Sequence, residues 1–241
     1  MKILISPAKT VKEGSAPYAT LPAFQKEGNR ILSELSKKKT EELMDVWQCS
    51  EKIVQLNLRR FESTDILMPA ILRYTGLQYK NLSFETLNEK AKNYLNEHVR
   101  ILSSLYGILR PQDGIPAYRL DFHSQLKVED KDLYAYWNNR PYSEIKDPEI
   151  INLASSEYSE LITPHLSESD YMTDIVFLNE KGKAQSTLVK QARGKFLRWL
   201  CENEITEVEK MKLFEEDNFV YSNDLSDDSH LVFVKSSLQK Q

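Results

Sequence analysis

The sequence predicts an α/β fold, a single domain in which a mixed β-sheet is surrounded by helices. Short apolar segments typical of strands alternate along the chain with segments whose apolar residues recur at helical spacing. The 241 residues are enough to bury a substantial core, and 41% hydrophobic and 28% charged residues are ordinary globular usage. No repeat, low-complexity tract or Pro/Gly/Ser linker divides the chain. We therefore expect residues 1–241 to form one domain.

The first half of the chain is predicted to be mainly helical after one opening strand. That strand covers residues 3–5. A helix is expected from Pro22, because proline suits the first helical position, and further helices after Thr40 and Ser50, which are plausible N-caps. A longer amphipathic helix is predicted over residues 84–102.

The second half alternates more regularly between strands and helices. An amphipathic helix containing Tyr134 and Trp137 separates the first two strands expected here. A later strand leads into a turn at residues 179–183, where Gly182 supplies an unusual backbone conformation, and a helix follows over residues 186–201. The strands predicted in this half cover residues 117–122, 150–154, 174–178, 219–222 and 231–234.

Acidic residues are concentrated near the C-terminal end of the sequence. The chain has 32 basic and 36 acidic residues, a formal net charge of -4 and a pI near 5.7. Residues 202–229 hold 10 acidic residues against 2 lysines, so this stretch carries −8 and the remainder carries +4. The total charge excludes a protein that coats nucleic acid or anionic membrane with its whole surface. A solvated acidic helix is the simpler explanation of the stretch, and an acidic flank beside a local basic surface is the alternative.

The cysteines and the apolar segments indicate a cytoplasmic protein. Cys49 and Cys201 lie far apart and lack the spacing of a zinc or redox motif, which fits a reducing compartment. The opening apolar segment is too short for a signal peptide, and no apolar run approaches the about 20 residues that span a bilayer. No glycine-rich nucleotide motif occurs. We therefore expect no membrane partner and no cofactor, and a monomer.

The helix predicted over residues 186–201 carries the clearest electrostatic feature. Lys190, Arg193 and Arg198 fall on the face opposite its apolar residues, and such a face can hold phosphates, although basic outward faces are common on helices. Gly194 costs this helix about 1 kcal/mol relative to alanine. A glycine at this position suggests that another backbone or a ligand approaches closely.

Polar residues gather around the end of the strand predicted over residues 150–154. Asn152 lies within the strand, and Ser155 and Glu157 follow it where a helix begins. The carboxyl ends of strands form the ligand crevice of open α/β sheets. The same residues are equally consistent with an N-cap and an acidic first turn. The absence of a G-x-S-x-G context argues against a nucleophile-elbow hydrolase.

Residues 102–113 follow the long predicted helix and contain Gly107 and Pro111. A helix, a turn at Gly107 and a second helical segment would form a helix-hairpin-helix, whose backbone N–H groups can bind a phosphate oxygen without reading bases. Arg100 and Arg110 on either side would add positive charge. Glycine and proline are also common at the C-terminal ends of helices that bind no ligand.

The histidines give little support for a metal site. His123 lies two residues after Asp121, and the pair can in principle chelate a metal from one side of a strand. No third ligand is identifiable in the sequence, so we expect no metal centre.

Several strings of the sequence resemble the YaaA family of peroxide-stress resistance proteins. They occur in the order and spacing of that family and cover nearly the whole chain, from Met1 to Lys235. The strings are ILISPAKT, YTGLQYKNL, HVRILSSLYGILRPQDGIPAYRLDF, DLYAYW, IINLASSEY, QARG and LVFVK. The resemblance implies a cytosolic bacterial protein that protects against hydrogen peroxide and limits iron-dependent damage to DNA. It also implies a single-domain α/β fold with a positively charged cleft, a helix-hairpin-helix and DNA binding.

The resemblance also assigns residues to the implied cleft and hairpin. Gln191 stands where the family usually has lysine, which removes one positive charge from the implied groove. The residues that the matching strings place there are Ser6, Lys9, Tyr106, Gly107, Arg110, Tyr118, Arg119, Asn152, Ser155, Glu157, Tyr158, Arg193 and Gly194.

Two functions from different classes are therefore predicted. The preferred one is a cytosolic peroxide-stress protein that binds duplex or branched DNA through a basic cleft without sequence preference. The residues expected to contact DNA are Lys9, Arg100, Tyr106, Gly107, Arg110, Arg119, Lys190, Arg193 and Arg198. The alternative is an enzyme acting on a nucleoside, nucleotide or damaged base, with Glu157 as general acid/base and Lys9 or Arg119 stabilising an anion beside Asn152. Direct sequestration of iron is the least supported alternative.

Overall fold

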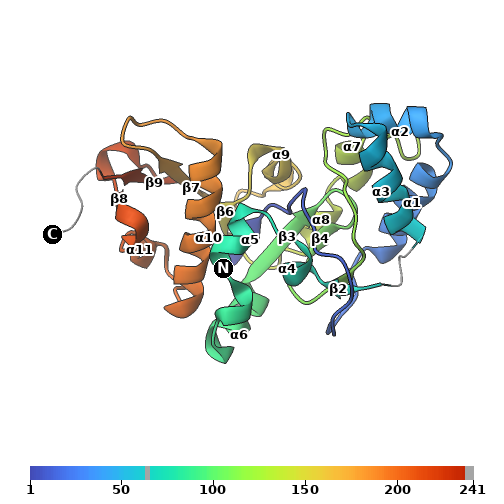
Figure 1. The fold of residues 1–241 in the computed structure, drawn as a ribbon. Helices are drawn as coiled ribbons and strands as arrows, with labels where there is room; N and C mark the ends of the chain where they lie inside the picture. Colours follow the sequence, from blue (N-terminus) through green and yellow to red (C-terminus); the bar gives the residue numbers. More distant parts are fainter. Residues whose placement is uncertain (63–65, 237–241) are drawn as a thin grey trace.

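The computed structural model describes residues 1–62 and 66–236. Within them the chain forms a seven-stranded mixed sheet in the order β4-β3-β1-β6-β7-β9-β8 and a separate pair, β2-β5 (Figure 1). The strands are β1 (Lys2–Ile5), β2 (Met68–Pro69), β3 (Val99–Ser103), β4 (Gly107–Leu109), β5 (Gly114–Ile115), β6 (Glu149–Leu153), β7 (Tyr171–Leu178), β8 (Phe219–Tyr221) and β9 (His230–Lys235). The five inner strands are parallel, and the edge strands β4 and β8 are antiparallel to their neighbours. The predicted α/β fold with a mixed sheet is confirmed.

Helices surround this sheet and supply most of the remaining regular structure. The α-helices are α1 (Gln25–Ser36), α2 (Thr40–Trp47), α3 (Glu51–Glu62), α4 (Ala70–Arg73), α5 (Leu77–Leu82), α6 (Glu89–His98), α7 (Leu133–Trp137), α8 (Arg140–Ser143), α9 (Ser156–Ser159), α10 (Ser186–Glu202) and α11 (Val208–Met211). Short 3₁₀ turns are η1 (Phe84–Thr86), η2 (Thr163–His165), η3 (Glu216–Asn218) and η4 (Asn223–Leu225). The helices α1, α2 and α3 gather at the end of the molecule opposite α10 and α11 (Figure 1).

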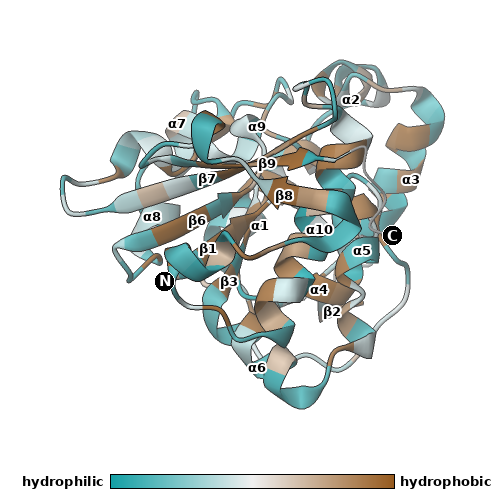
Figure 2. Cartoon of the chain, turned by 90° about the vertical axis from the view of Figure 1, so that its left-hand side faces the viewer, coloured by the Kyte–Doolittle hydropathy of each residue, from teal (hydrophilic) through white to brown (hydrophobic). Residues whose placement is uncertain are grey.

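The core lies on both faces of the sheet. In Figure 2 the inner strands carry apolar segments, and the helices show alternating apolar and polar bands. The sheet separates α7 and α9 on one side from α10, α5 and α6 on the other. On the α10 side, the Phe177 ring packs against Phe196 with ring centroids 5.8 Å apart and against Phe233 at 5.5 Å. Aromatic burial of this kind is a major contribution to core stability. The aromatic residues therefore fix α10 against β7 and β9.

Most predicted elements are present, but the helix over residues 84–102 is wrong at both ends. Residues 84–86 form η1, the helix α6 ends at His98, and β3 follows directly. The apolar residues of β3 continue the helical spacing by coincidence, while β-branched Val99 and Ile101 favour a strand. The Arg100 side chain binds the last carbonyl groups of α6 and so terminates the helix.

The helix-hairpin-helix predicted at residues 102–113 is also wrong, because this segment forms the β3–β4 hairpin. Ser103 pairs with Gly107 across an antiparallel ladder, and Gly107 adopts a φ of 70°. This left-handed conformation costs glycine little and lets the chain reverse. A turn between two helices occurs instead at α2–α3, where Gln48 adopts the left-handed conformation.

The strand predicted at residues 117–122 is the third error. This segment is mostly buried, but it joins no strand of the described chain. Side chains satisfy part of its backbone: the Ser104 hydroxyl donates to the Leu120 carbonyl at 2.7 Å, and the Phe122 N–H donates to Glu157 at 3.1 Å. An apolar run predicts burial, and it cannot by itself distinguish a buried loop from a strand.

Candidate functional site

The carboxyl end of the parallel sheet brings Ser6 and Ser155 together. Ser6 follows β1, and Ser155 follows β6, which is the neighbour of β1 in the sheet. The Ser155 backbone N–H donates to the Ser6 hydroxyl at 2.9 Å, and the two hydroxyl oxygens are 3.3 Å apart. Because β3 flanks β1 on its other side, this is the topological switch point at which open α/β sheets bind ligands.

Charged side chains lie beside this serine pair. The Lys9 ammonium contacts the Asp121 carboxylate at 3.0 Å, and the next backbone N–H, that of Phe122, binds the Glu157 carboxylate. The segment at 121–122 therefore brings Lys9 and Glu157 into one neighbourhood. Burial raises the pKa of Cys49, in the α2–α3 turn, and the positive charge of Arg119 partly opposes this rise. Arg119 therefore lies near that turn.

Buried tyrosines form the inner wall of the same region. The Tyr118 hydroxyl is 2.7 Å from the Ser103 hydroxyl and 2.6 Å from that of Tyr74. Tyr79 donates to the Ser6 carbonyl at 2.8 Å. Burial raises the pKa of Tyr118 to about 12, and it raises that of Tyr158 further. These hydroxyls therefore stay protonated and act as hydrogen-bond donors and acceptors.

Asn152 is engaged within the sheet. Its amide nitrogen donates to Asp174 on β7 at 2.6 Å, and its amide oxygen accepts from the Ala154 N–H at 2.9 Å. With a relative exposure of 6%, Asn152 holds the turn after β6 and so positions Ser155.

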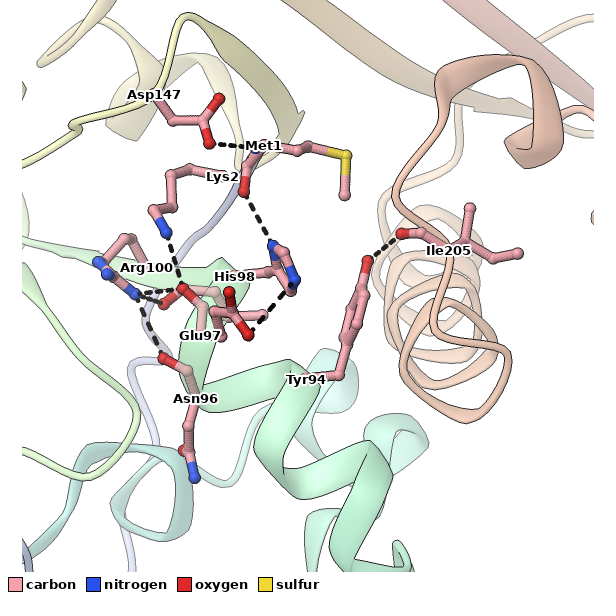
Figure 3. Close-up of polar contacts among 10 residues, drawn as sticks. Met1, Lys2, Tyr94, Asn96, Glu97, His98, Arg100, Asp147 and Ile205 are labelled. Atoms are coloured by element: carbon pink, nitrogen blue, oxygen red, sulfur yellow. Dashed lines mark hydrogen bonds and ion pairs between the residues drawn. The ribbon is translucent and has the colours of Figure 1, made fainter.

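Arg100 and Arg110 lie at the other end of β1, away from Lys9. Arg100 binds the Val99 carbonyl at 2.7 Å, and Lys2 donates to the Glu97 carbonyl at 2.9 Å (Figure 3). Burial, followed by the repulsion of Arg100, lowers the pKa of Lys2, which shows that these cations are neighbours. Arg100 caps α6, and Arg110 is exposed beyond β4.

Tyr106 and Gly107, at the turn of the β3–β4 hairpin, face the interior. Tyr106 has an exposure of 4%, and a Cβ added to Gly107 would lie 2.9 Å from the Trp137 ring. The structure thus places them under the surface, where they support the hairpin.

The basic residues of α10 have three different environments. Arg198 donates to the Leu82 carbonyl at 3.1 Å and to the Thr86 hydroxyl at 2.8 Å, and so caps the end of α5. Lys190 is exposed, whereas Arg193 is half-buried. The nine residues predicted to contact DNA therefore do not gather at one place. They are distributed over the carboxyl edge of the sheet (Lys9), the surroundings of the α2–α3 turn (Arg119), the opposite end of β1 (Arg100, Arg110), the turn of the β3–β4 hairpin (Tyr106, Gly107) and α10 (Lys190, Arg193, Arg198).

Two surface grooves flank residues 12–14, and neither was predicted from the sequence. Groove A, of about 160 Å³, is lined by Glu13, Gly14, Leu56, Arg59, Arg60, Ile66, Arg73 and Ala117. Groove B, of about 330 Å³, is lined by Lys12, Ile71, Leu72, Tyr74, Thr75, Tyr79, Lys80, Ser83, Phe84, Glu85 and Thr86. Lys80 falls in the string YTGLQYKNL, which was the available signal, while Arg59 lies outside every such string.

Two other kinds of feature, a membrane-spanning helix and a metal site, are absent from the described residues. No helix over 1–62 and 66–236 is both long and apolar enough to span a bilayer. The same residues contain no group of three or more His, Cys, Asp or Glu side chains placed to hold a metal ion.

Comparisons with known proteins give a consistent result over the whole chain. A family model described as peroxide stress protein YaaA matches residues 1–225. A UPF0246 protein of Pediococcus pentosaceus is 36% identical, with 100% of both chains covered. A UPF0246 protein of Lachnoclostridium phytofermentans is 36% identical over 98% of this chain and 96% of its own. One from Limosilactobacillus reuteri is 38% identical over 97% and 98%.

Proposed function

Because this chain belongs to the YaaA family of peroxide stress proteins, we propose that it protects DNA by binding the duplex without reading its sequence. The observation that carries the proposal is the pair of grooves on either side of residues 12–14. Five basic side chains line them, Lys12 and Lys80 in groove B and three arginines in groove A, against the acidic Glu13 and Glu85. A net positive charge concentrated in adjacent grooves attracts a phosphate backbone.

Most of this charge is left available to a ligand. Lys12, Lys80 and Arg59 are exposed and have no ion pair with any residue in the described chain, whereas Arg60 pairs with Glu13 at 2.7 Å. Arg73 is fully buried, its hydrogen bonds go only to carbonyl oxygens, and the Glu13 carboxylate acts on it through its charge alone. Contacts to phosphates position a protein on DNA without specifying bases, which fits sequence-independent binding. A protein layer over the duplex would also limit the iron-dependent oxidation of the DNA beneath it.

The double variant Lys12→Ala/Lys80→Ala tests the proposal. Loss of about two phosphate contacts is expected to weaken binding of a labelled duplex at low salt by about tenfold. Fluorescence anisotropy measures the affinity. The matched control is Lys146→Ala/Lys183→Ala, which removes the same charge from exposed positions outside both grooves and should bind like wild type. Equal affinity of the groove variant and wild type would contradict the proposal.

An enzyme acting on a nucleoside, nucleotide or damaged base is the second candidate. The observation that favours it is the meeting of Lys9, Glu157 and the Ser6–Ser155 pair at the switch point. A carboxylate there can act as general acid/base, and an ammonium can stabilise an anion. The wild-type protein should then convert such a compound when the products are followed by chromatography.

The variant Glu157→Gln separates this candidate from duplex binding. It should abolish conversion and leave duplex affinity unchanged, because Glu157 lines neither groove. Absence of conversion by the wild-type protein for all three compound classes would eliminate the enzymatic candidate.

A further inference from the structure

Arg193 on α10 is a charged side chain without a partner. Its Nε is buried and unbonded, and the guanidinium makes no hydrogen bond or ion pair with any residue in the described part of the chain. Burial lowers the pKa of Arg193, and the Asp174 carboxylate opposes this only by its longer-range charge. A buried donor such as this Nε ordinarily has a hydrogen-bond acceptor, because desolvation without a partner is costly.

A second unpaired donor belongs to the same helix contact. The Gln78 amide nitrogen is buried and unbonded, and the residue as a whole has an exposure of 7%. The backbone of Gln78 packs directly on Gly194, the residue after Arg193: a Cβ there would lie 3.0 Å from the Gln78 carbonyl carbon. Gln78 on α5 and Arg193 on α10 thus each have a buried N–H donor without an acceptor.

This contact lies beside the carboxyl end of the sheet. The next residue of α5, Tyr79, donates to the Ser6 carbonyl at 2.8 Å, and Gly76 approaches Ala8 so closely that a Cβ would lie 2.8 Å from its methyl group. Donors near the switch point are where a ligand of an α/β sheet is expected.

We propose that the α5–α10 contact is an oxyanion site, in which Arg193 and Gln78 hold a phosphate or carboxylate group of a small ligand. A guanidinium fork and an amide N–H together match the several acceptor oxygens of such a group, and the charge of the anion compensates a desolvated arginine. The site goes beyond duplex binding, since neither residue lines groove A or groove B.

Thermal unfolding of Arg193→Met tests the site, with inorganic phosphate and acetate as probes in chloride buffer of constant ionic strength. Without oxyanions the variant is expected to melt about 2–4 °C above wild type, because a half-buried charge without a partner is replaced by an apolar chain. Phosphate or acetate should raise the melting temperature of wild type saturably, by about 2–4 °C near saturation, and should not raise that of the variant. The anion with the larger effect identifies the ligand group.

Arg198→Met on the same helix is the matched control. Arg198 has hydrogen-bond partners at Leu82 and Thr86, so its replacement should lower the melting temperature and keep the response to the anion. Gln78→Met should weaken the affinity for the anion, so that about tenfold more anion is needed for the same rise in melting temperature. It provides a second variant if Arg193→Met does not fold. The site is overturned if wild type responds to neither anion, or if Arg193→Met and Gln78→Met both respond like wild type. The variant Lys12→Ala/Lys80→Ala should retain the full response, so loss of duplex binding and loss of the oxyanion site are distinguishable.

Discussion

Arg73→Ala is expected to lower the free energy of unfolding by about 4 kcal/mol. Arg73 has 0% exposure, and its guanidinium donates to the carbonyl oxygens of Lys12, Gly14, Ile66 and Ile115 at 2.5–3.2 Å. Alanine leaves these acceptors without their donor and opens a cavity, and both effects destabilise the folded chain. Urea unfolding followed by circular dichroism measures the change.

Two further variants define what Arg73 contributes. Arg73→Lys should recover less than half of the lost stability, because an ammonium cannot reproduce the planar fork that reaches several carbonyl groups. Arg59→Ala, an exposed arginine of the same groove, should change stability by no more than about 0.5 kcal/mol. An unfolding free energy for Arg73→Ala within about 1 kcal/mol of wild type would contradict the structural role of Arg73.

Gly194→Ala is expected to destabilise the protein by about 3 kcal/mol, even though alanine is the better helix former. An added Cβ would collide with the Gln78 carbonyl oxygen and would lie 2.8 Å from the Asn81 Cβ. The helix preference favours alanine by about 1 kcal/mol. A loss of stability in the variant therefore means that the clash outweighs this preference. Differential scanning calorimetry of the two proteins gives the answer.

Lys190→Ala is the control for this helix. Lys190 is exposed on α10, and its replacement removes no packing contact, so it should leave the melting temperature nearly unchanged. A Gly194→Ala protein that melts above wild type would show that α5 does not approach α10 as closely as described.

The long helix α10 and most of the strands were predictable because their signals are local. The apolar runs at β1, β6 and β9 indicated strands, and Gly194 indicated the close backbone approach that the structure places at Gln78. The β3–β4 hairpin was not predictable, since its apolar residues fit helical spacing and the termination of α6 depends on a side chain, Arg100, folding back onto it.

The candidate site likewise has a part that the sequence predicted and a part that depends on contacts between distant segments. Polar residues after β1 and β6 were expected to lie near the strand ends, and Ser6 and Ser155 do meet there. The grooves depend on contacts between distant segments: Arg73 binds the carbonyl groups of residues 12 and 14, and α3 supplies Arg59. No periodicity or motif encodes such an arrangement, so the individual lysines and arginines looked like ordinary surface charge.

The salt dependence of duplex binding tests the central claim most directly. Titration of the wild-type protein into a labelled duplex at several salt concentrations gives the slope of the logarithm of the association constant against the logarithm of salt. Each neutralised phosphate contributes about −0.9, so the three exposed, unpaired cations of the grooves predict a slope near −3, and the Lys12→Ala/Lys80→Ala variant a slope near −1. The same slope for both proteins, or no binding at low salt, would contradict DNA binding through these grooves.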